Sequence, residues 1–245
     1  MRDDLLDAQA AIDWAVAQIP LLQQGFVEWQ RRNPYSVVQE RDPDTGENIA
    51  VTYDQPFPLT FNAEVGAIIN SLRSSLDLLA AALATRNGVK PSNRTHFPIF
   101  DSLHTMIDPL EGIEGKKWLS KSERTAIKAL NPHKGGDDTL WPLHRLDILR
   151  KHERLLSTSP DVKGFLMMGR HMHVGGTKAI KRLENKTVLL GLARGEILNA
   201  TQGNTLLATF ITSREPSLGL NDEEVATLLR KFATRVTEVI ARFDS

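Results

Sequence analysis

One long apolar segment, 60–86, constrains the fold of this chain more than any other feature. Its large aliphatic residues recur at the three- and four-residue steps of one helix face: Val65, Ile68, Ile69, Leu72, Leu76, Leu79 and Leu83. Pro56 and Pro58 precede the segment and Asn87-Gly88 follows it, and these residues are start and stop signals for a helix. The small residues near its C-terminal end allow another helix to approach closely. The segment therefore predicts a long helix that packs against other helices.

A second segment, Asp137 to Ser157, combines an apolar helical pattern with a dense group of ionisable side chains. Asp137 and Asp138 stand where the N-terminus of a helix favours negative charge. Pro142 falls in the first turn, where its missing N–H costs little. We therefore expect a helix over 139–157.

The polar residues of this second helix form two rows. His144, Asp147 and Lys151 are spaced so that they line one side of the helix. Arg145 and His152 are seven residues apart and form the other row. Because the helix is partly buried, both rows need partners.

The 60–86 helix carries a matching polar row of Asn70, Arg73 and Asp77. In one interpretation, Arg73 and Asp77 form an ordinary pair within the helix, worth about 0.2–0.5 kcal/mol. In the other, the row belongs to a buried cluster shared between the two helices, since an unpaired buried charge is costly. In that case we expect it to face Asp147, Lys151 and His152.

The rest of the chain predicts an α+β fold. Apolar spacing over 5–29 indicates an amphipathic helix that Pro20 should kink or restart, and 34–55 reads as a β-hairpin. Three β-compatible runs, 163–174, 187–198 and 205–213, predict a small antiparallel sheet that could continue the hairpin. A C-terminal amphipathic helix should begin with Asn221 as its N-cap. The predicted architecture is a helical bundle with an inserted β-hairpin, followed by a small antiparallel sheet and the C-terminal helix. We divide it into 1–160 and 161–245, which could form one continuous domain.

Composition limits the classes of function. The 245 residues include 30 basic and 30 acidic side chains, so the net charge gives no overall attraction to nucleic acid or to an anionic membrane. No secretory leader and no run of roughly 20 apolar residues is apparent, and we expect a cytoplasmic protein with no membrane partner. The absence of cysteine excludes disulfides, thiolate metal sites and a cysteine nucleophile. No GxGxxG, P-loop or GxSxG motif occurs, so we expect no cofactor.

Basic residues concentrate in 112–136. The candidate nucleic-acid-binding residues there are Lys116, Lys117, Lys121 and Arg124. A capping box from Ser120 to Glu123 opens a short helix in the same region. The cluster is interpreted either as a solvated helix face or as a surface that contacts phosphates.

His171 and His173 suggest a metal site only weakly. Two imidazoles separated by one residue share a face of a strand and can begin a zinc or iron site. The remaining ligands cannot be placed, and no HExxH pattern is present. We assign no metal ligands and keep a His-based metal protein as an alternative.

Three motifs carry a resemblance to known proteins. They are Asn70 to Asp77, His96-Phe-Pro-Ile-Phe100, and Leu146 to Leu155 preceded by Trp141. In this order the motifs resemble a widespread group of bacterial and phage-borne proteins, over most of the chain. The helices are similar to those of HEPN-type bundles, in which an Arg and a His separated by four to six residues act on RNA. Arg145 and His152 match that spacing, although Arg145 is followed by a leucine and no histidine lies near Arg73.

Two main hypotheses follow. In the first, the resemblance implies a metal-independent RNA-acting protein, with His152 as general acid or base, Arg145 binding phosphate, and Lys151 or Arg73 stabilising charge. A homodimer would then be expected. In the second, which we favour, the protein is a non-catalytic binding or assembly module with a buried polar network between 60–86 and 139–157. If that junction is open, its ligand-binding residues are Asn70, Arg73, Asp77 and Asp147. The sequence indicates no particular protein partner.

Overall fold

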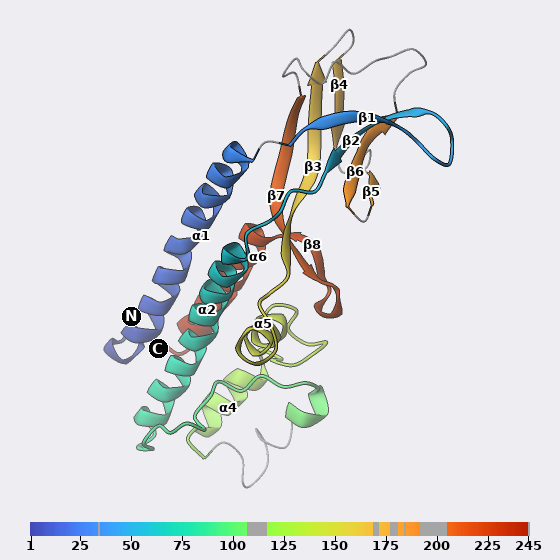
Figure 1. Cartoon of the computed structure of the whole chain (residues 1–245). Coiled ribbons are helices and arrows are strands. Elements are labelled where there is room, and N and C mark those ends of the chain that lie inside the picture. The colour runs from blue at the N-terminus through green and yellow to red at the C-terminus, as the bar shows by residue number, and fades with distance from the viewer. Residues whose placement is uncertain are drawn as a thin grey trace.

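Helices and strands occupy different ends of the molecule. The computed structural model describes residues 1–33, 35–106, 117–168, 172–176, 181–183, 185–191 and 205–244. The bundle contains α1 (Leu6–Arg32), α2 (Leu59–Arg86), α5 (Leu140–His152) and α6 (Val225–Ala241), with the shorter α4 (Lys121–Lys128) at its lower end in Figure 1. The strands project from the opposite end, and the two chain termini lie close together. The α+β fold is confirmed.

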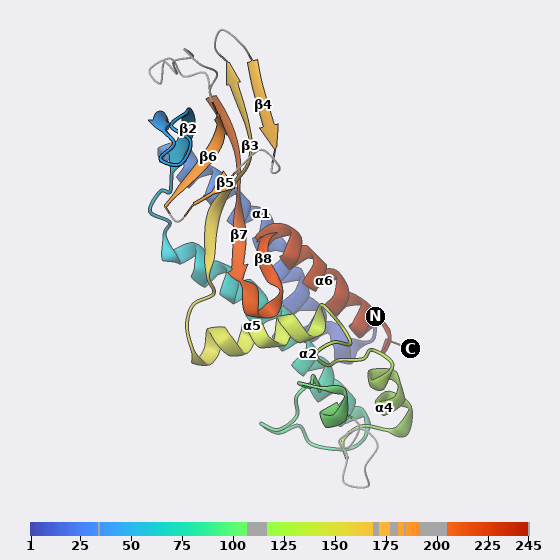
Figure 2. The same cartoon turned by 90° about the vertical axis from the view of Figure 1, so that its right-hand side faces the viewer.

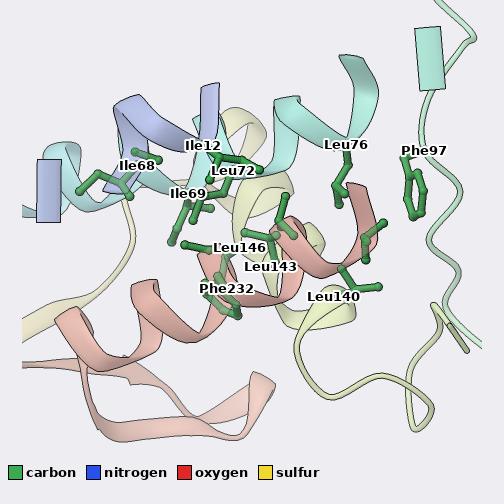
Figure 3. Packing of buried hydrophobic residues seen from close by; sticks show 14 of the residues in the cluster. Ile12, Ile68, Ile69, Leu72, Leu76, Phe97, Leu140, Leu143, Leu146 and Phe232 are labelled. Carbon is green, nitrogen blue, oxygen red and sulfur yellow. The ribbon is translucent and has the colours of Figure 1, made fainter. Parts of the chain in front are cut away.

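The bundle is organised around α2. Its buried aliphatic side chains pack against α1, α5 and α6 in one continuous core. Figure 3 shows part of this core: Ile12, Ile68, Ile69, Leu72, Leu76, Phe97, Leu140, Leu143, Leu146 and Phe232. Among the described helices, α2 is long and apolar enough to cross a membrane by length and composition, with 61% of the relevant window buried. That burial is typical of a core helix.

The ends of α1 and α2 largely follow the sequence pattern. Asn87 caps α2 and its backbone N–H bonds the last carbonyls, while Gly88 has a φ of 70°, which glycine adopts without strain. A short 3₁₀ turn, Asp3–Leu5, leads into α1. α1 then runs through Pro20 without restarting, because one lost backbone donor is outweighed by the packing of its buried face.

The strands of the described residues form two antiparallel sheets. The first has the order β1-β2-β6-β5, from Val37–Arg41, Asn48–Tyr53, Lys186–Gly191 and Lys181–Arg182. The second has the order β4-β3-β7-β8, from Met172–Gly176, Thr158–Met168, Thr205–Glu215 and Leu220–Glu224. The predicted hairpin is therefore continued by β6 and β5, whereas β3, β4, β7 and β8 make a separate sheet. Ala50, Val162, Phe165 and Leu189 form a small core among these strands.

Residue 160, where we placed the division of the chain, lies inside β3. At Pro160 this strand pairs with β7 through Ile211, and its described pairing with β4 runs from Gly164 to Met168. The position at which we divided the chain is therefore part of the ladder between β3 and β7.

The C-terminal helix begins later than the sequence indicated. α6 starts at Val225, and Asn221 belongs to β8, where it pairs with Arg214 of β7. The prediction that Asn221 is the N-cap of the helix is wrong, because the backbone polar groups of this segment form hydrogen bonds with β7 instead.

The helix expected over 139–157 is also shorter than predicted. α5 ends at His152, and the chain then turns toward β3. The two terminal nitrogens of Arg154 donate to the Glu215 carboxylate at 2.9 and 2.8 Å, and the Ser157 N–H donates to it at 2.8 Å. Glu215 is 1% exposed. A tertiary contact therefore replaces the last helical turn and fixes the direction in which α5 leaves the bundle.

We predict that Glu215→Gln lowers the free energy of unfolding by about 2 kcal/mol, since hydrogen bonds to a buried carboxylate are worth more than those to a neutral amide. Urea denaturation monitored by circular dichroism measures the change. Glu153→Gln is the matched control, because Glu153 is exposed. Equal losses in the two variants would contradict the assigned role of Glu215.

Candidate functional site

The two polar helix rows meet where α5 lies across α2 (Figure 2). Asn70 donates from Nδ2 to Oδ1 of Asp147 at 3.1 Å, so the rows are joined directly. The other oxygen of Asp147 lies 2.5 Å from Nζ of Lys151, and Arg150 approaches Oδ1 at 3.4 Å. Asp147 is only 3% exposed. Its buried charge is therefore compensated by cations from its own helix and by an amide from α2.

Arg73 is the centre of the junction. It is 4% exposed, and each of its three nitrogens has a partner. Nη1 donates to Oδ1 of Asp77 at 2.6 Å and Nη2 donates to the Phe97 carbonyl at 3.1 Å. Nε donates to Nδ1 of His144 at 3.2 Å. One side chain of α2 thus holds both α5 and the extended segment that contains Phe97.

Asp77 also binds the extended segment that contains Phe97. Its Oδ1 also accepts the backbone N–H of Phe97 at 2.9 Å, so Arg73 and Asp77 together bind both backbone polar groups of that residue. Arg73 and Asp77 are therefore an intrahelical pair and part of a cluster shared between elements. The two interpretations of the row are compatible.

His144 is held in its neutral form. Burial lowers the pKa of His144 to about 4, and the nearby charge of Arg73 acts in the same direction. Because Nδ1 accepts a hydrogen bond from Arg73, the proton of the neutral ring is assigned to Nε2. His144 is therefore a neutral donor near pH 7.

A cavity of about 300 Å³ opens beside this network, and we call it the α2–α5 cleft. Its polar lining residues are Arg73, Asp77, His96, His144, Asp147, Lys151 and His152. Its apolar lining residues are Phe97, Pro98, Ile99, Phe100 and Ile148. The side chains of His96 and Lys151 are 58% and 39% exposed, and His152 is exposed as well. The cleft thus has a sealed polar floor and a mouth that solvent reaches.

His96 stands at that mouth between two oxygen atoms. Its Nε2 lies 2.7 Å from the Asn93 carbonyl, and its Nδ1 lies 3.5 Å from Oδ2 of Asp77. These contacts orient the ring through its own segment and through α2. The extended segment therefore supplies one side of the cleft, as well as closing the core through Phe97, which is 1% exposed.

The structure separates the residues predicted to act on RNA. Lys151 and His152 line the cleft, whereas Arg145 is half-buried on α5 and is not among the lining residues. Asn70 supports Asp147 from outside the lining. Arg73, Asp77 and Asp147 do line the cleft. Their polar atoms already form hydrogen bonds or ion pairs with residues of α2, α5 and the segment that contains Phe97.

The other candidate residues lie elsewhere. Lys117 and Lys121 are exposed, Arg124 is half-buried, and none of them lines the cleft; Lys116 falls outside the described residues. His171 is also outside them, and the backbone of His173 pairs with Met167 in the second sheet. Within the described residues, no group of three or more His, Asp or Glu side chains could hold a metal ion. The predicted absence of a cofactor is not tested by these observations.

Sequence reasoning did not include His144 or His96 among the site residues. His144 could have been included, because it shares a helix row with Asp147 and Lys151. His96 had a weaker signal, namely its place in a proline-flanked segment expected to cross the core surface. Its contact with Asp77 depends on the path of that segment, which spacing along the chain does not determine.

We predict that Asp77→Ala lowers the free energy of unfolding by roughly 3 kcal/mol, because it leaves the buried Arg73 guanidinium without its carboxylate. Lys151→Ala should cost at most about 1 kcal/mol, because its side chain is partly exposed and Asp147 keeps other partners. Urea denaturation measures both, with Glu64→Ala on the exposed face of α2 as the control. An Asp77→Ala loss no larger than that of the control would contradict the network.

A pH dependence follows from His144. Its pKa in the folded chain, about 4, lies below the ordinary value of 6.5, so between these values the unfolded chain binds a proton that the folded chain excludes. The free energy of unfolding should therefore decrease as the pH is lowered through this window, by about 3 kcal/mol from this residue. Urea denaturation at several pH values should show a shallower decline for His144→Gln than for the unsubstituted chain. Parallel curves would contradict the assignment.

Similarity to known proteins does not assign the cleft to a family. The chain was compared with protein-family models, curated proteins and solved structures, and none of them matched. The resemblance to HEPN-type bundles accordingly stays a prediction. The function has to be inferred from the chemistry of the cleft itself.

Proposed function

We propose that the protein is a non-catalytic binding module whose α2–α5 cleft takes a small molecule with an anionic group on an apolar or aromatic body. One observation carries this proposal. The solvent-open cavity has the cation of Lys151 and the imidazole of His152 on its polar side, and Phe100 and Ile148 among its apolar residues. A pocket with an apolar lining and a few fixed polar groups is typical of small-molecule sites.

The exposed nitrogen donors of the mouth support an anionic ligand. Among the lining residues the formal charges balance, with Arg73 and Lys151 against Asp77 and Asp147, so the support comes from which of these groups reach solvent. The most exposed polar side chains at the mouth, Lys151, His96 and His152, carry nitrogen donors, whereas the carboxylate of Asp77, which is 28% exposed, is already paired with Arg73. An anion placed there would gain charge-assisted hydrogen bonds without displacing the buried pairs.

The apolar side supports a planar or aliphatic body on the same ligand. Phe97 is fully packed and fixes the wall, while Ile99 and Phe100 are half-buried, so part of their surface faces outward. Covering such surface contributes about 25 cal/mol per Å². A nucleoside monophosphate combines the two required features, a phosphate and a flat base, and serves as a probe of this ligand class.

The polar floor supports binding rather than catalysis. Asp147 already accepts from Asn70 and pairs with Lys151, and the nitrogens of Arg73 are occupied. His144 titrates far below neutral pH and is a poor proton carrier there. These groups are held in fixed positions, which favours recognition with little reorganisation.

Binding can be measured by isothermal titration calorimetry with adenosine 5′-monophosphate, adenosine and inorganic phosphate. The monophosphate should bind most tightly, since it alone offers both groups. Lys151→Ala should weaken it by about tenfold, corresponding to one charge-assisted hydrogen bond. Lys121→Ala is the control, because Lys121 is an exposed lysine outside the cleft lining.

Equal affinity for adenosine and its monophosphate, or equal weakening by both substitutions, would contradict the proposed site. The competing proposal, RNA cleavage by Arg145 and His152, predicts metal-independent cleavage that disappears in His152→Ala and Arg145→Ala. Such cleavage in the unsubstituted protein would replace the binding proposal.

A further inference from the structure

The ring of His144 offers the α2–α5 cleft a hydrogen-bond donor. His144 lines the cavity, and its Nδ1 accepts the 3.2 Å hydrogen bond from Nε of Arg73. A guanidinium has no acceptor and keeps its protons, so Nδ1 must be the unprotonated ring nitrogen. The proton of the neutral ring then lies on Nε2. The contact with Arg73 therefore decides which tautomer His144 adopts.

The Nε2–H group of His144 is available to a ligand. Within the part of the chain that the structure describes, Nε2 has no hydrogen-bond partner. It is also not one of the side-chain atoms that are sealed from solvent without a hydrogen bond. Because His144 is a half-buried lining residue, we assign this solvent-reached donor to the open space of the cleft.

The position and the protonation of this donor are fixed by its surroundings. Arg73 is 4% exposed and is itself bound to Asp77 and to the Phe97 carbonyl at 2.6 and 3.1 Å. If His144 rotated away or exchanged its tautomer, the buried Nε of Arg73 would lose its acceptor, which is costly. Burial also lowers the pKa of His144 to about 4, so the ring stays neutral at pH 7. Nε2 is thus a preorganised donor that cannot act as an acceptor.

His144 and Lys151 mark two separate parts of the cleft. They lie on one side of α5 seven residues apart, so roughly 10 Å of helix separates their Cα atoms. Ile148 lies between them and adds apolar surface to the lining. A ligand whose anionic group meets Lys151 at the mouth can therefore lay its body over Ile148 and bring the far end of that body to His144.

We propose that His144 is a specificity-determining residue of the cleft, which selects ligands whose flat body carries a hydrogen-bond acceptor such as a ring nitrogen or a carbonyl oxygen. That role rests on the binding function proposed above and narrows the class of ligand. An anion on a pure hydrocarbon body leaves the fixed donor without a partner from the ligand. A body that presents an N–H group at this point opposes one donor with another. Both kinds of ligand should bind more weakly than one with an acceptor.

The alternative is that His144 only supports Arg73. In that role Nδ1 alone matters, and an acceptor on the ligand has no effect on affinity. The two roles therefore differ in what the ligand must carry, so changes made to the ligand separate them without altering the protein.

Isothermal titration calorimetry with adenosine 5′-monophosphate and its 1-deaza, 3-deaza and 7-deaza analogues tests the proposal on the unsubstituted protein. Each analogue replaces one ring nitrogen by a C–H group and keeps the phosphate, so it removes a single acceptor. One analogue should bind about five- to tenfold more weakly than the monophosphate, which corresponds to one neutral hydrogen bond. Equal affinities for the monophosphate and all three analogues would overturn the role of His144 and leave the proposed function standing. No binding of the monophosphate would overturn both.

Substitutions assign the discrimination to His144. In His144→Phe, which keeps a ring and removes the donor, the monophosphate and the weakened analogue should bind equally. His152→Phe is the matched control, because it removes an imidazole of the mouth and should change both affinities alike. Thermal melting monitored by circular dichroism checks that both variants fold, since His144→Phe also takes the acceptor from Arg73. A difference between the two ligands that persists in folded His144→Phe would overturn the assignment.

The tautomer of His144 can be tested without any variant. Long-range ¹H–¹⁵N correlation spectra of the histidine rings at pH 7 should show His144 with a proton on Nε2 and none on Nδ1. Adding adenosine 5′-monophosphate should shift the Nε2 resonance in step with the calorimetric saturation. A proton on Nδ1, or an Nε2 resonance that the bound monophosphate leaves unchanged, would overturn the proposed role.

Discussion

The buried guanidinium of Arg73 is the interaction on which the arrangement of this molecule depends. A cation that is 4% exposed must be paired, and its partners come from its own helix, from α5 and from the segment that contains Phe97. Without those hydrogen bonds, the apolar core would still favour collapse, but the angle of α5 and the path of the segment would be less strictly specified. Arg73 therefore connects the packing of the core to the shape of the α2–α5 cleft.

Burial divides the polar residues of the junction into two roles. Arg73 and Asp147 are sealed and paired, so they position other groups, whereas Lys151, His152 and His96 reach solvent. The network is thus both a structural junction and the floor of a site. This division explains how buried charges, which contribute little net stability by themselves, can be useful: they fix the geometry of exposed groups above them.

Much of the helical part could be predicted from sequence because long periodic segments such as 59–86 determine their own buried face. The contact of Asn70 with Asp147 followed from matching rows on two helices. The places where prediction failed depended on distant partners. Arg154 binds the distant Glu215 carboxylate, and this contact stops α5 at His152. Pairing with β7 keeps Asn221 in a strand. Neither contact can be read from the residues next to it in the sequence. The contact of His96 with Asp77 was missed for the same reason.

Nuclear magnetic resonance of the ¹⁵N-labelled chain, titrated with adenosine 5′-monophosphate, tests the central claim most directly. The α2–α5 cleft predicts saturable shifts of backbone amides at Phe97, Ile99, Phe100, Ile148 and Lys151, the residues that surround the cavity. The amides of α4 and of the strands should stay unchanged. Saturable shifts confined to α4, or no saturable shifts at the cleft, would contradict the claim that the Arg73 network frames a ligand-binding site.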